Sequence, residues 1–230
     1  MIFNGVNLSE YFKIRDIRKS LLPRITNVLK EIPGKAGSRY LKDKLQPLII
    51  SIDIEIKDKS KLEDKMNYIK TFLYTKDLKR LRILDKYYFA KLDGSTDLEK
   101  ILYYRNTTLN FLCPDPIAYG ETKTIDISSN TTIINQGSYK TTGRITIEVT
   151  QSIGHIQVTQ QNTGEYVYIE HDFVAGDEVI IDLDREYVTK NGYSIMKDVY
   201  LESDFFDIPV GEFELTSSVP ATLEYVERWL

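Results

Sequence analysis

The fold of this chain is decided by an alternating stretch, Leu48-Ile49-Ile50-Ser51-Ile52-Asp53-Ile54-Glu55-Ile56. A period of two places one face against a core and the other largely in water, as in a β-strand. The segment Ser60-Lys61-Leu62-Glu63 then has the form of a helix capping box. An apolar stripe at helical spacing follows it, formed by Leu62, Met66, Ile69 and Leu73. We predict a strand over 48–56 and a helix over 61–74 that lies on the apolar face of this strand.

The same reasoning extends outward in both directions. Further strands are predicted at 80–84, 87–92 and 107–112, with a tight turn at Asp93-Gly94. The second half reads as short strands separated by turns such as Asn162-Thr163-Gly164 and Asn191-Gly192. These strands are predicted at 122–127, 131–135, 144–150, 155–160, 165–170, 178–183, 199–202, 211–217 and 221–227. Many short strands at regular spacing favour a β-sandwich or jelly roll. The predicted class is therefore mainly β with one helix (α+β).

Residues 18–46 interrupt this pattern. The apolar residues between Leu21 and Ile32 have helical spacing, but Pro23 lies within the run and Pro33-Gly34 ends it. A basic stretch to Lys44 follows. We interpret 18–46 as an extended excursion from the sheet.

Charge divides the chain near Gly120. The protein has 230 residues, and its net charge of −4 is the sum of +8 over residues 1–120 and −12 over residues 121–230. A break in charge and composition of this size indicates a domain boundary. We predict domains at 1–118 and 119–230; one domain with polar faces is the alternative. No apolar stretch approaches the ~20 residues of a membrane-spanning helix, and a single cysteine excludes an internal disulfide.

Residues that suggest chemistry are few. His171 stands between Glu170 and Asp172, but neighbours on a strand point to opposite faces, so a solvated strand end is favoured over a metal site. Asp182 and Asp184 lie on one strand face, whereas glycoside hydrolysis needs two carboxyls across a cleft. Cys113 has apolar and turn-forming neighbours and reads as a buried small residue rather than a nucleophile. We therefore expect no catalytic, cofactor-binding or metal-binding residues and no enzyme.

Two surface features remain open. Residues 76–91 carry six basic side chains against two acidic ones, which suits a solvated face or an acidic protein partner better than nucleic acid. The sixteen tyrosines stack on sugars or partners if exposed, but positions such as Tyr166 and Tyr168 alternate on strands and are as easily core or interface.

The order of several short motifs resembles the distal tail protein (Dit) family of long-tailed, siphovirus-type bacteriophages and prophages. They run through the whole chain: Phe3-Asn4-Gly5, Tyr11-Phe12, Ile17, Ile32-Pro33-Gly34 with Gly37, the Leu62–Leu73 helix, Tyr88 to Leu92 with Gly94, Asn110-Phe111, Cys113-Pro114-Asp115-Pro116, Ala118-Tyr119-Gly120, Asn135-Gln136-Gly137, Gly176-Asp177, Asn191-Gly192, Pro209-Val210-Gly211 and Arg228-Trp229-Leu230. The resemblance implies a β-sandwich-like N-terminal ring domain with a helix and a C-terminal galectin-like or jelly-roll β-sandwich.

The function implied by this resemblance is structural. Family members form a homo-hexameric ring that joins the tail tube protein to the tail-tip or baseplate proteins in the virion tail, and they are made in the cytoplasm of the bacterial host. No membrane, no cofactor and no specific nucleic acid is implied. The alternative is a carbohydrate-binding module with a weak contact to host glycans. Galectin-type sugar sites use a stacking tryptophan, and the single tryptophan here is Trp229. A wall-degrading enzyme is a third, remote reading.

Overall fold

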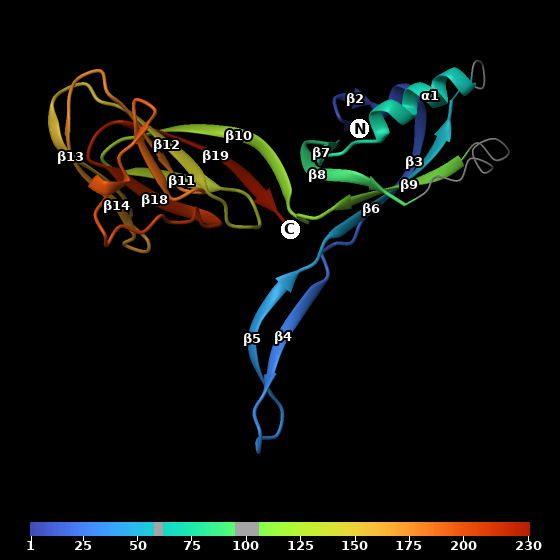
Figure 1. Cartoon of the computed structure of the whole chain (residues 1–230), viewed down its shortest axis with the longest axis horizontal. Helices are drawn as coiled ribbons and strands as arrows, with labels where there is room; N and C mark the ends of the chain where they lie inside the picture. The colour runs from blue at the N-terminus through green and yellow to red at the C-terminus, as the bar shows by residue number, and fades with distance from the viewer. Residues whose placement is uncertain (58–61, 95–105) are drawn as a thin grey trace. The chain divides into compact units, whose positions relative to one another are not determined.

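The computed structural model describes residues 1–57, 62–94 and 106–230 (Figure 1). Among these residues the regular structure is β-strand, apart from one α-helix and two short 3-10 helices. The chain divides into two compact units: unit 1, Met1–Ala118 with Leu230, and unit 2, Tyr119–Trp229. The predicted class, mainly β with one helix, is confirmed.

Unit 1 is a sheet that turns a corner. Apart from β4 and β5, its strands follow the order β3-β6-β9-β8-β7-β1-β2. Within unit 1, strand β8 takes part in two ladders: Lys86–Ala90 pairs with β7, and Lys91–Asp93 pairs with β9. A strand shared in this way lets one sheet continue into a second layer. The rings of Phe3 and Phe111 lie 4.8 Å apart in the core of this unit. The elements of unit 1 are β1 (Ile2–Phe3), β2 (Val6–Asn7), η1 (Leu8–Glu10), β3 (Phe12–Arg18), β4 (Ile25–Glu31), β5 (Ser38–Leu45), β6 (Leu48–Ile56), α1 (Leu62–Leu73), β7 (Lys79–Ile83), β8 (Lys86–Asp93) and β9 (Asn106–Cys113).

Strand β6 is the predicted alternating strand and lies between β3 and β9. Its five even-numbered residues, from Leu48 to Ile56, are all buried. Each such side chain contributes on the order of 1.5–3 kcal/mol when fully buried. On the other face, the Thr108 hydroxyl donates a 2.6 Å hydrogen bond to Asp53 Oδ1, and the Ser51 hydroxyl donates one of 2.7 Å to Asn110 Oδ1. The strands predicted at 80–84, 87–92 and 107–112 are confirmed as β7, β8 and β9.

Helix α1 is confirmed at Leu62–Leu73. Ile69 and Leu73 from the predicted stripe are buried, and so is Phe72. The rings of Tyr68 and Phe72 lie 5.7 and 5.8 Å from that of Tyr11. The capping residue Ser60 and the side chains of Leu62, Glu63 and Met66 lie outside the described part of the chain. That the helix covers the apolar face of β6 stays a prediction.

Unit 2 is built from two antiparallel sheets. One has the order β17-β16-β15-β12-β19-β10 and the other β11-β18-β13-β14. A single core draws on both sheets, including Ile145 and Leu223 from the first and Val158 and Phe213 from the second. This arrangement is a β-sandwich. Its elements are β10 (Ala118–Ile127), β11 (Thr131–Asn135), β12 (Gly143–Glu148), β13 (Ile153–Gln160), β14 (Tyr166–Phe173), β15 (Glu178–Asp182), β16 (Tyr187–Lys190), β17 (Tyr193–Ser194), η2 (Met196–Asp198), β18 (Gly211–Ser217) and β19 (Ala221–Trp229).

The predicted strand at 199–202 is wrong. Val199 makes only an isolated bridge with Ile169, and Leu201 is fully exposed. The segment instead follows the edge of β14 through single hydrogen bonds, such as that from the Tyr200 N–H to the Tyr168 carbonyl at 2.9 Å. Residues of high β propensity therefore form an irregular strap here, joined to the edge strand β14 by single hydrogen bonds and not by a regular ladder.

The sequence reading missed the strands β16 and β17. They form a hairpin around Asn191-Gly192, where both central residues have positive φ, 50° and 80°. This geometry is that of the type I′ turn, which Asn-Gly favours strongly. The turn was predicted, but the strands beside it are too short and too polar to be seen as alternating.

Candidate assembly surface

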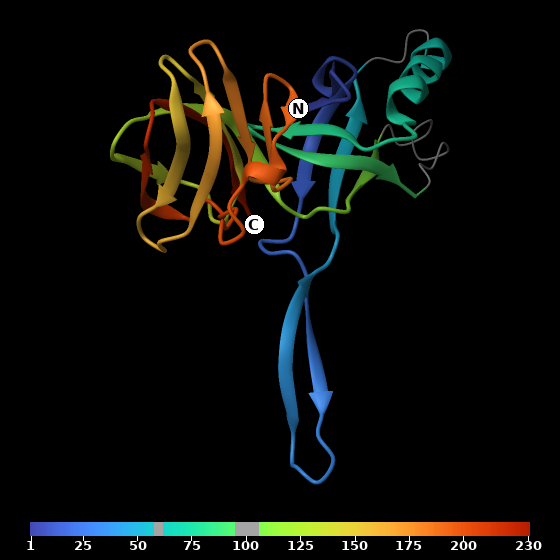
Figure 2. The same cartoon turned by 60° about the vertical axis from the view of Figure 1, so that its left-hand side comes forward.

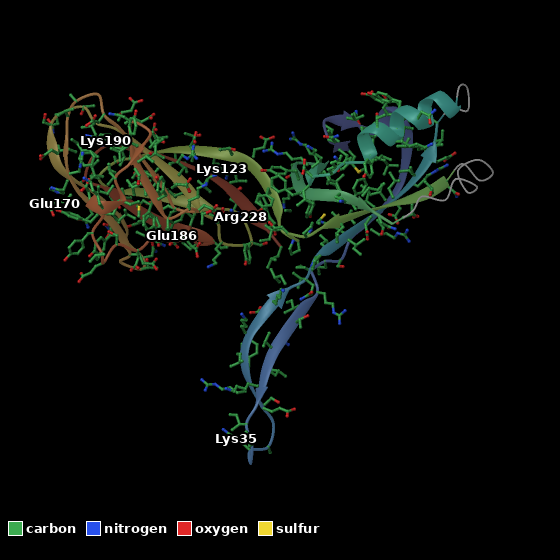
Figure 3. All side chains as sticks on the ribbon, in the orientation of Figure 1. Lys35, Lys123, Glu170, Glu186, Lys190 and Arg228 are labelled. Carbon is green, nitrogen blue, oxygen red and sulfur yellow. The ribbon has the colours of Figure 1, made fainter. Side chains whose placement is uncertain are left out.

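The predicted excursion at 18–46 is the β4–β5 hairpin. Its strands pair with each other and with no other described strand. Both views show it as a separate two-stranded ribbon (Figure 1, Figure 2), and Lys35 lies at its turn (Figure 3). The chain is extended here despite its helical spacing. Pro23 and Pro33 limit any helix to the short run between them, and a helix of that length is marginal on its own in water. The extended interpretation is confirmed.

The register gives the hairpin two chemically different faces. Residues directly opposite each other in an antiparallel pair share a face. The pairs Ile25 with Leu45 and Leu29 with Tyr40 define an apolar face, and the Tyr40 hydroxyl donates a 3.1 Å hydrogen bond to Asp43 on the same side. The other face, which we call the cationic face, carries Lys30, Arg39, Lys42 and Lys44. A bulge between Val28 and Leu29 sets this arrangement.

The apolar face is uncovered in the single chain. Leu29 is 58% exposed and Tyr40 55% exposed, and Ile25 is nearly half exposed. An isolated two-stranded hairpin is at best marginally stable in water, and its apolar residues gain nothing until a second surface covers them. The hairpin is therefore the part of the described chain that most clearly requires a partner.

The residues considered as metal ligands are not gathered into a site. His171 Nδ1 lies 2.8 Å from Asp198 Oδ2, and both side chains are largely buried. Asp177 is used elsewhere: it accepts hydrogen bonds from the Val174 N–H and from Asn191 Nδ2, and it pairs with Lys190 at 3.3 Å. Across residues 1–57, 62–94 and 106–230, no three His, Cys, Asp or Glu side chains are placed to hold a metal ion.

The two candidate carboxylates have structural partners. Asp182 Oδ1 accepts the N–H groups of Asp184 and Arg185 at the turn after β15, and its other oxygen lies 3.5 Å from Arg144. Asp184 accepts a hydrogen bond from the Thr142 hydroxyl at 2.9 Å. These contacts fix a turn, and they do not oppose the two carboxyls across a cleft.

Cys113 is buried at the end of β9. Burial raises the pKa of its thiol to about 12, and the nearby Asp115 carboxylate adds to the rise. A thiol with such a pKa carries almost no thiolate at neutral pH, which favours the predicted packing role of Cys113 over that of a nucleophile.

The basic segment 76–91 forms the β7–β8 hairpin of unit 1. Arg80 lies over the ring of Tyr87, 4.8 Å from its centroid, and Tyr87 meets Phe89 edge to face. This surface combines guanidinium and aromatic groups, which is typical of protein interfaces. No helix in the described part of the chain is long and apolar enough to span a bilayer.

Unit 2 carries a cluster of partly exposed aromatic side chains, which we call the aromatic cluster: His155, Tyr168 and Tyr200. The rings of His155 and Tyr168 stack at 5.5 Å, and Tyr200 meets Tyr168 edge to face at 6.0 Å. Trp229 lies elsewhere, packed so closely over Gly120 that a Cβ at that glycine would lie 2.8 Å from the indole. The tryptophan is thus a packing residue, and the aromatic cluster holds no tryptophan.

Two family models match the chain and together cover most of it. Residues 6–113 match the phage tail protein RIFT-related domain, and residues 136–229 match the C-terminal domain of the siphovirus-type tail component. The distal tail protein of Bacillus phage SPP1 is 22% identical over 241 residues, covering 100% of this chain and 95% of that protein. The crystal structure of SPP1 Dit, described as a paradigm of the hub adsorption apparatus in phages that infect Gram-positive bacteria, aligns with a TM-score of 0.84 at 18% identity, over 100% of this chain and 98% of that one.

These matches agree with the architecture above, since each family model falls within one of the two units. The fold is shared along the full length of the SPP1 protein. The chain therefore belongs to the distal tail protein (Dit) family of siphovirus-type tail components.

Proposed function

We propose that this protein is the structural hub of a siphovirus-type tail, a homo-hexameric ring at the distal end of the tail tube. The observation that carries the assembly is the uncovered apolar face of the β4–β5 hairpin. Copies in a ring offer each hairpin a neighbouring surface, so that Ile25, Leu29 and Tyr40 leave water without a further protein. Family membership supports the place of this ring in the tail.

We assign the ring to residues 1–118 and a galectin-like β-sandwich to residues 119–230. The hairpin belongs to the first unit, whereas the second has a core of its own drawn from two sheets. The hub joins the tail tube protein on one side to tail-tip or baseplate proteins on the other. It is made in the host cytoplasm, takes its place in the virion tail, and performs no catalysis and uses no cofactor.

The experiment is to measure the mass of the full-length protein in solution by light scattering and native mass spectrometry. We expect a hexamer, and we expect Leu29→Ser with Tyr40→Ser to reduce it to smaller species. The matched control is Leu201→Ser, which replaces an exposed leucine of unit 2. A wild-type protein that is strictly monomeric at all concentrations contradicts the ring.

A second candidate function is glycan binding by unit 2, which the aromatic cluster favours. Aromatic rings stack on the apolar faces of sugars, and Gln157 stands directly opposite Tyr168 with an amide that can bond to hydroxyls. A glycan array with the wild type and Tyr168→Ala tests it, with the exposed Tyr193→Ala as control. Glycan binding by a monomer, lost in Tyr168→Ala alone, favours the carbohydrate-binding module over the hub.

A further inference from the structure

We propose that the cationic face of the β4–β5 hairpin docks on an acidic sheet face of unit 2 in a second copy of this chain. This rests on the proposed function, because it names what the hairpin contacts when copies assemble. It adds a second kind of contact to the apolar one. It also assigns that contact to a particular surface of unit 2.

The four basic side chains of the cationic face have no acidic ion-pair partner among the described residues. Lys30, Arg39, Lys42 and Lys44 are all exposed, and among the described residues none of them forms an ion pair. Lys42 and Lys44 are two residues apart on one strand, and Arg39 lies opposite Lys30. Like charges at opposite positions in a β-ladder repel one another. This repulsion is relieved when an anionic surface covers the face.

The complementary surface is the outer face of the sheet formed by β15, β12, β19 and β10. Glu148 stands directly opposite Glu178 in the β12–β15 ladder, so a second like-charge pair faces solvent. Asp126 and Glu224 lie on the same outer face, as the burial of their neighbours Ile127 and Leu223 shows. We call these four residues the acidic face. None of the four forms an ion pair among the described residues; Arg144, which stands directly opposite Glu224 on this face, lies 3.5 Å from Asp182 on its other side. The polar contact of Asp126 is with the Thr222 hydroxyl at 3.2 Å.

A hollow beside this face gives long side chains room to enter. Its volume is about 440 Å³, and its lining includes Asp126 and Glu148 together with Thr146, Thr150 and Thr222. Carboxylates and hydroxyl oxygens accept hydrogen bonds from ammonium and guanidinium groups. The hollow therefore suits the side chains that the cationic face presents.

A second copy is the occupant that the charges favour. The net charge is +8 over residues 1–120 and −12 over residues 121–230, so each copy brings one surface of each sign. Two different patches that fit each other make a head-to-tail contact, and such contacts form a ring when the rotation from one copy to the next closes. A contact of two identical patches would bring like charges together and would stop at a dimer. The proposed docking has the symmetry that a ring needs.

The experiment is a charge swap on the full chain, with association followed by sedimentation velocity at 0.1 M salt. Variant A carries Lys30→Glu, Arg39→Glu, Lys42→Glu and Lys44→Glu. Variant B carries Asp126→Lys, Glu148→Lys, Glu178→Lys and Glu224→Lys. We expect each alone to lose at least ten-fold in association constant. We expect an equal mixture of A and B to recover it, because A and B alternate around an even-numbered ring.

The control reverses charges outside both faces, with Lys35→Glu at the hairpin turn and Glu186→Lys in the turn before β16 (Figure 3). This variant should assemble like the wild type. Wild-type association should also weaken as salt rises from about 0.1 M to 1 M, because the Debye length falls from about 10 Å to 3 Å. That measurement needs no variant, so it stands even if A or B fails to fold.

The outcomes separate this inference from the proposed function. If A and B assemble like the wild type, or if wild-type association is unchanged at 1 M salt, the hexamer stands and the electrostatic docking is wrong. If A loses binding to a duplex DNA oligonucleotide but keeps its assembly, the cationic face serves nucleic acid and the docking is again wrong. If the wild type is monomeric under all conditions, the ring itself fails and the docking fails with it.

Discussion

Asp177 shows how a single side chain fixes one end of unit 2. Its carboxylate accepts hydrogen bonds from the Val174 N–H and Asn191 Nδ2, both at short distance, and lies 3.3 Å from Lys190 Nζ. Asn191 in turn accepts the N–H of Glu178. One carboxylate thus joins the loop before β15 to the β16–β17 turn.

These partners favour the ionised form and lower the pKa of Asp177, the Val174 N–H having the largest effect. A group whose pKa is lower in the folded than in the unfolded protein stabilises the fold above its unfolded pKa of about 3.9 and loses this contribution as pH falls toward the folded value. We expect Asp177→Asn to lower the Tm at pH 7. The difference from the wild type should shrink below about pH 4. A difference that is constant from pH 7 to pH 3 would contradict the role of the charge.

Position 137 has room only for glycine, because the main chain of β19 lies where a larger residue would place its Cβ. A Cβ at this position would lie 2.4 Å from the Arg228 carbonyl oxygen and 3.0 Å from the Arg228 nitrogen, both main-chain atoms of β19. Overpacking of this kind typically costs 1–3 kcal/mol, so Gly137→Ala should lower the free energy of unfolding by about that amount. Gly154→Ala is the matched control, because nothing lies within 4 Å of its Cβ position. Urea unfolding followed by circular dichroism compares the two, and equal stabilities would show that β19 can move aside.

At the scale of elements, helix α1 stabilises unit 1 through its buried face. Ile69 is 4% exposed, and Phe72 and Leu73 of the same helix are buried as well. We expect Ile69→Ala to destabilise the protein by roughly 2–5 kcal/mol, from the lost burial and the cavity left behind. The exposed Lys70→Ala in the same helix should change stability by less than about 0.5 kcal/mol. Thermal melting measures the stability of both variants. If Ile69→Ala lost as little stability as Lys70→Ala, the apolar stripe of the helix would be exposed to solvent and not buried.

In contrast to helix α1, the β4–β5 hairpin contributes little to the folding stability of the isolated chain. Its strands have no partner beyond each other, and most of their residues are exposed. Such an element gains its stability from assembly. The apolar face and the cationic face therefore act on association, whereas α1 acts on folding.

At the scale of the whole molecule, the two units should separate in function. We expect residues 1–118 to form oligomers and residues 119–230 to remain monomeric, because the hairpin lies in the first unit and the second has its own two-sheet core. Size-exclusion chromatography with light scattering measures both fragments, with circular dichroism to show that each is folded. Hexamers formed by 119–230 alone would contradict the assignment of the ring.

Local alternation in the sequence was sufficient to predict most strands of this protein. In β6, β12 and β18 one face is buried, and burial of one face favours an apolar residue at every second position. This alternation can be recognised in the sequence alone. It failed at 199–202, where Val199 and Tyr200 have strand character but meet only the edge of β14. A ladder needs a partner strand, and the partner is not encoded nearby.

The apolar and cationic faces of the β4–β5 hairpin could not be predicted from the sequence, because they too depend on pairing between strands. Simple alternation along β5 would place Tyr40 with Lys42 and Lys44, and Arg39 with Asp43 and Leu45. The bulge opposite Val28 and Leu29 resets the alternation, so Tyr40 joins the apolar face and Arg39 the cationic face. The sequence alone determined the β class, the helix, the extended course of 18–46 and the opposite charges of the two halves, because these depend on local pattern and composition. Only the three-dimensional structure decided the two faces of the hairpin and the corner at β8, because both depend on which residues pair across strands. A bulge in one strand or a change of pairing partner along a strand cannot be seen in the alternation of a single strand.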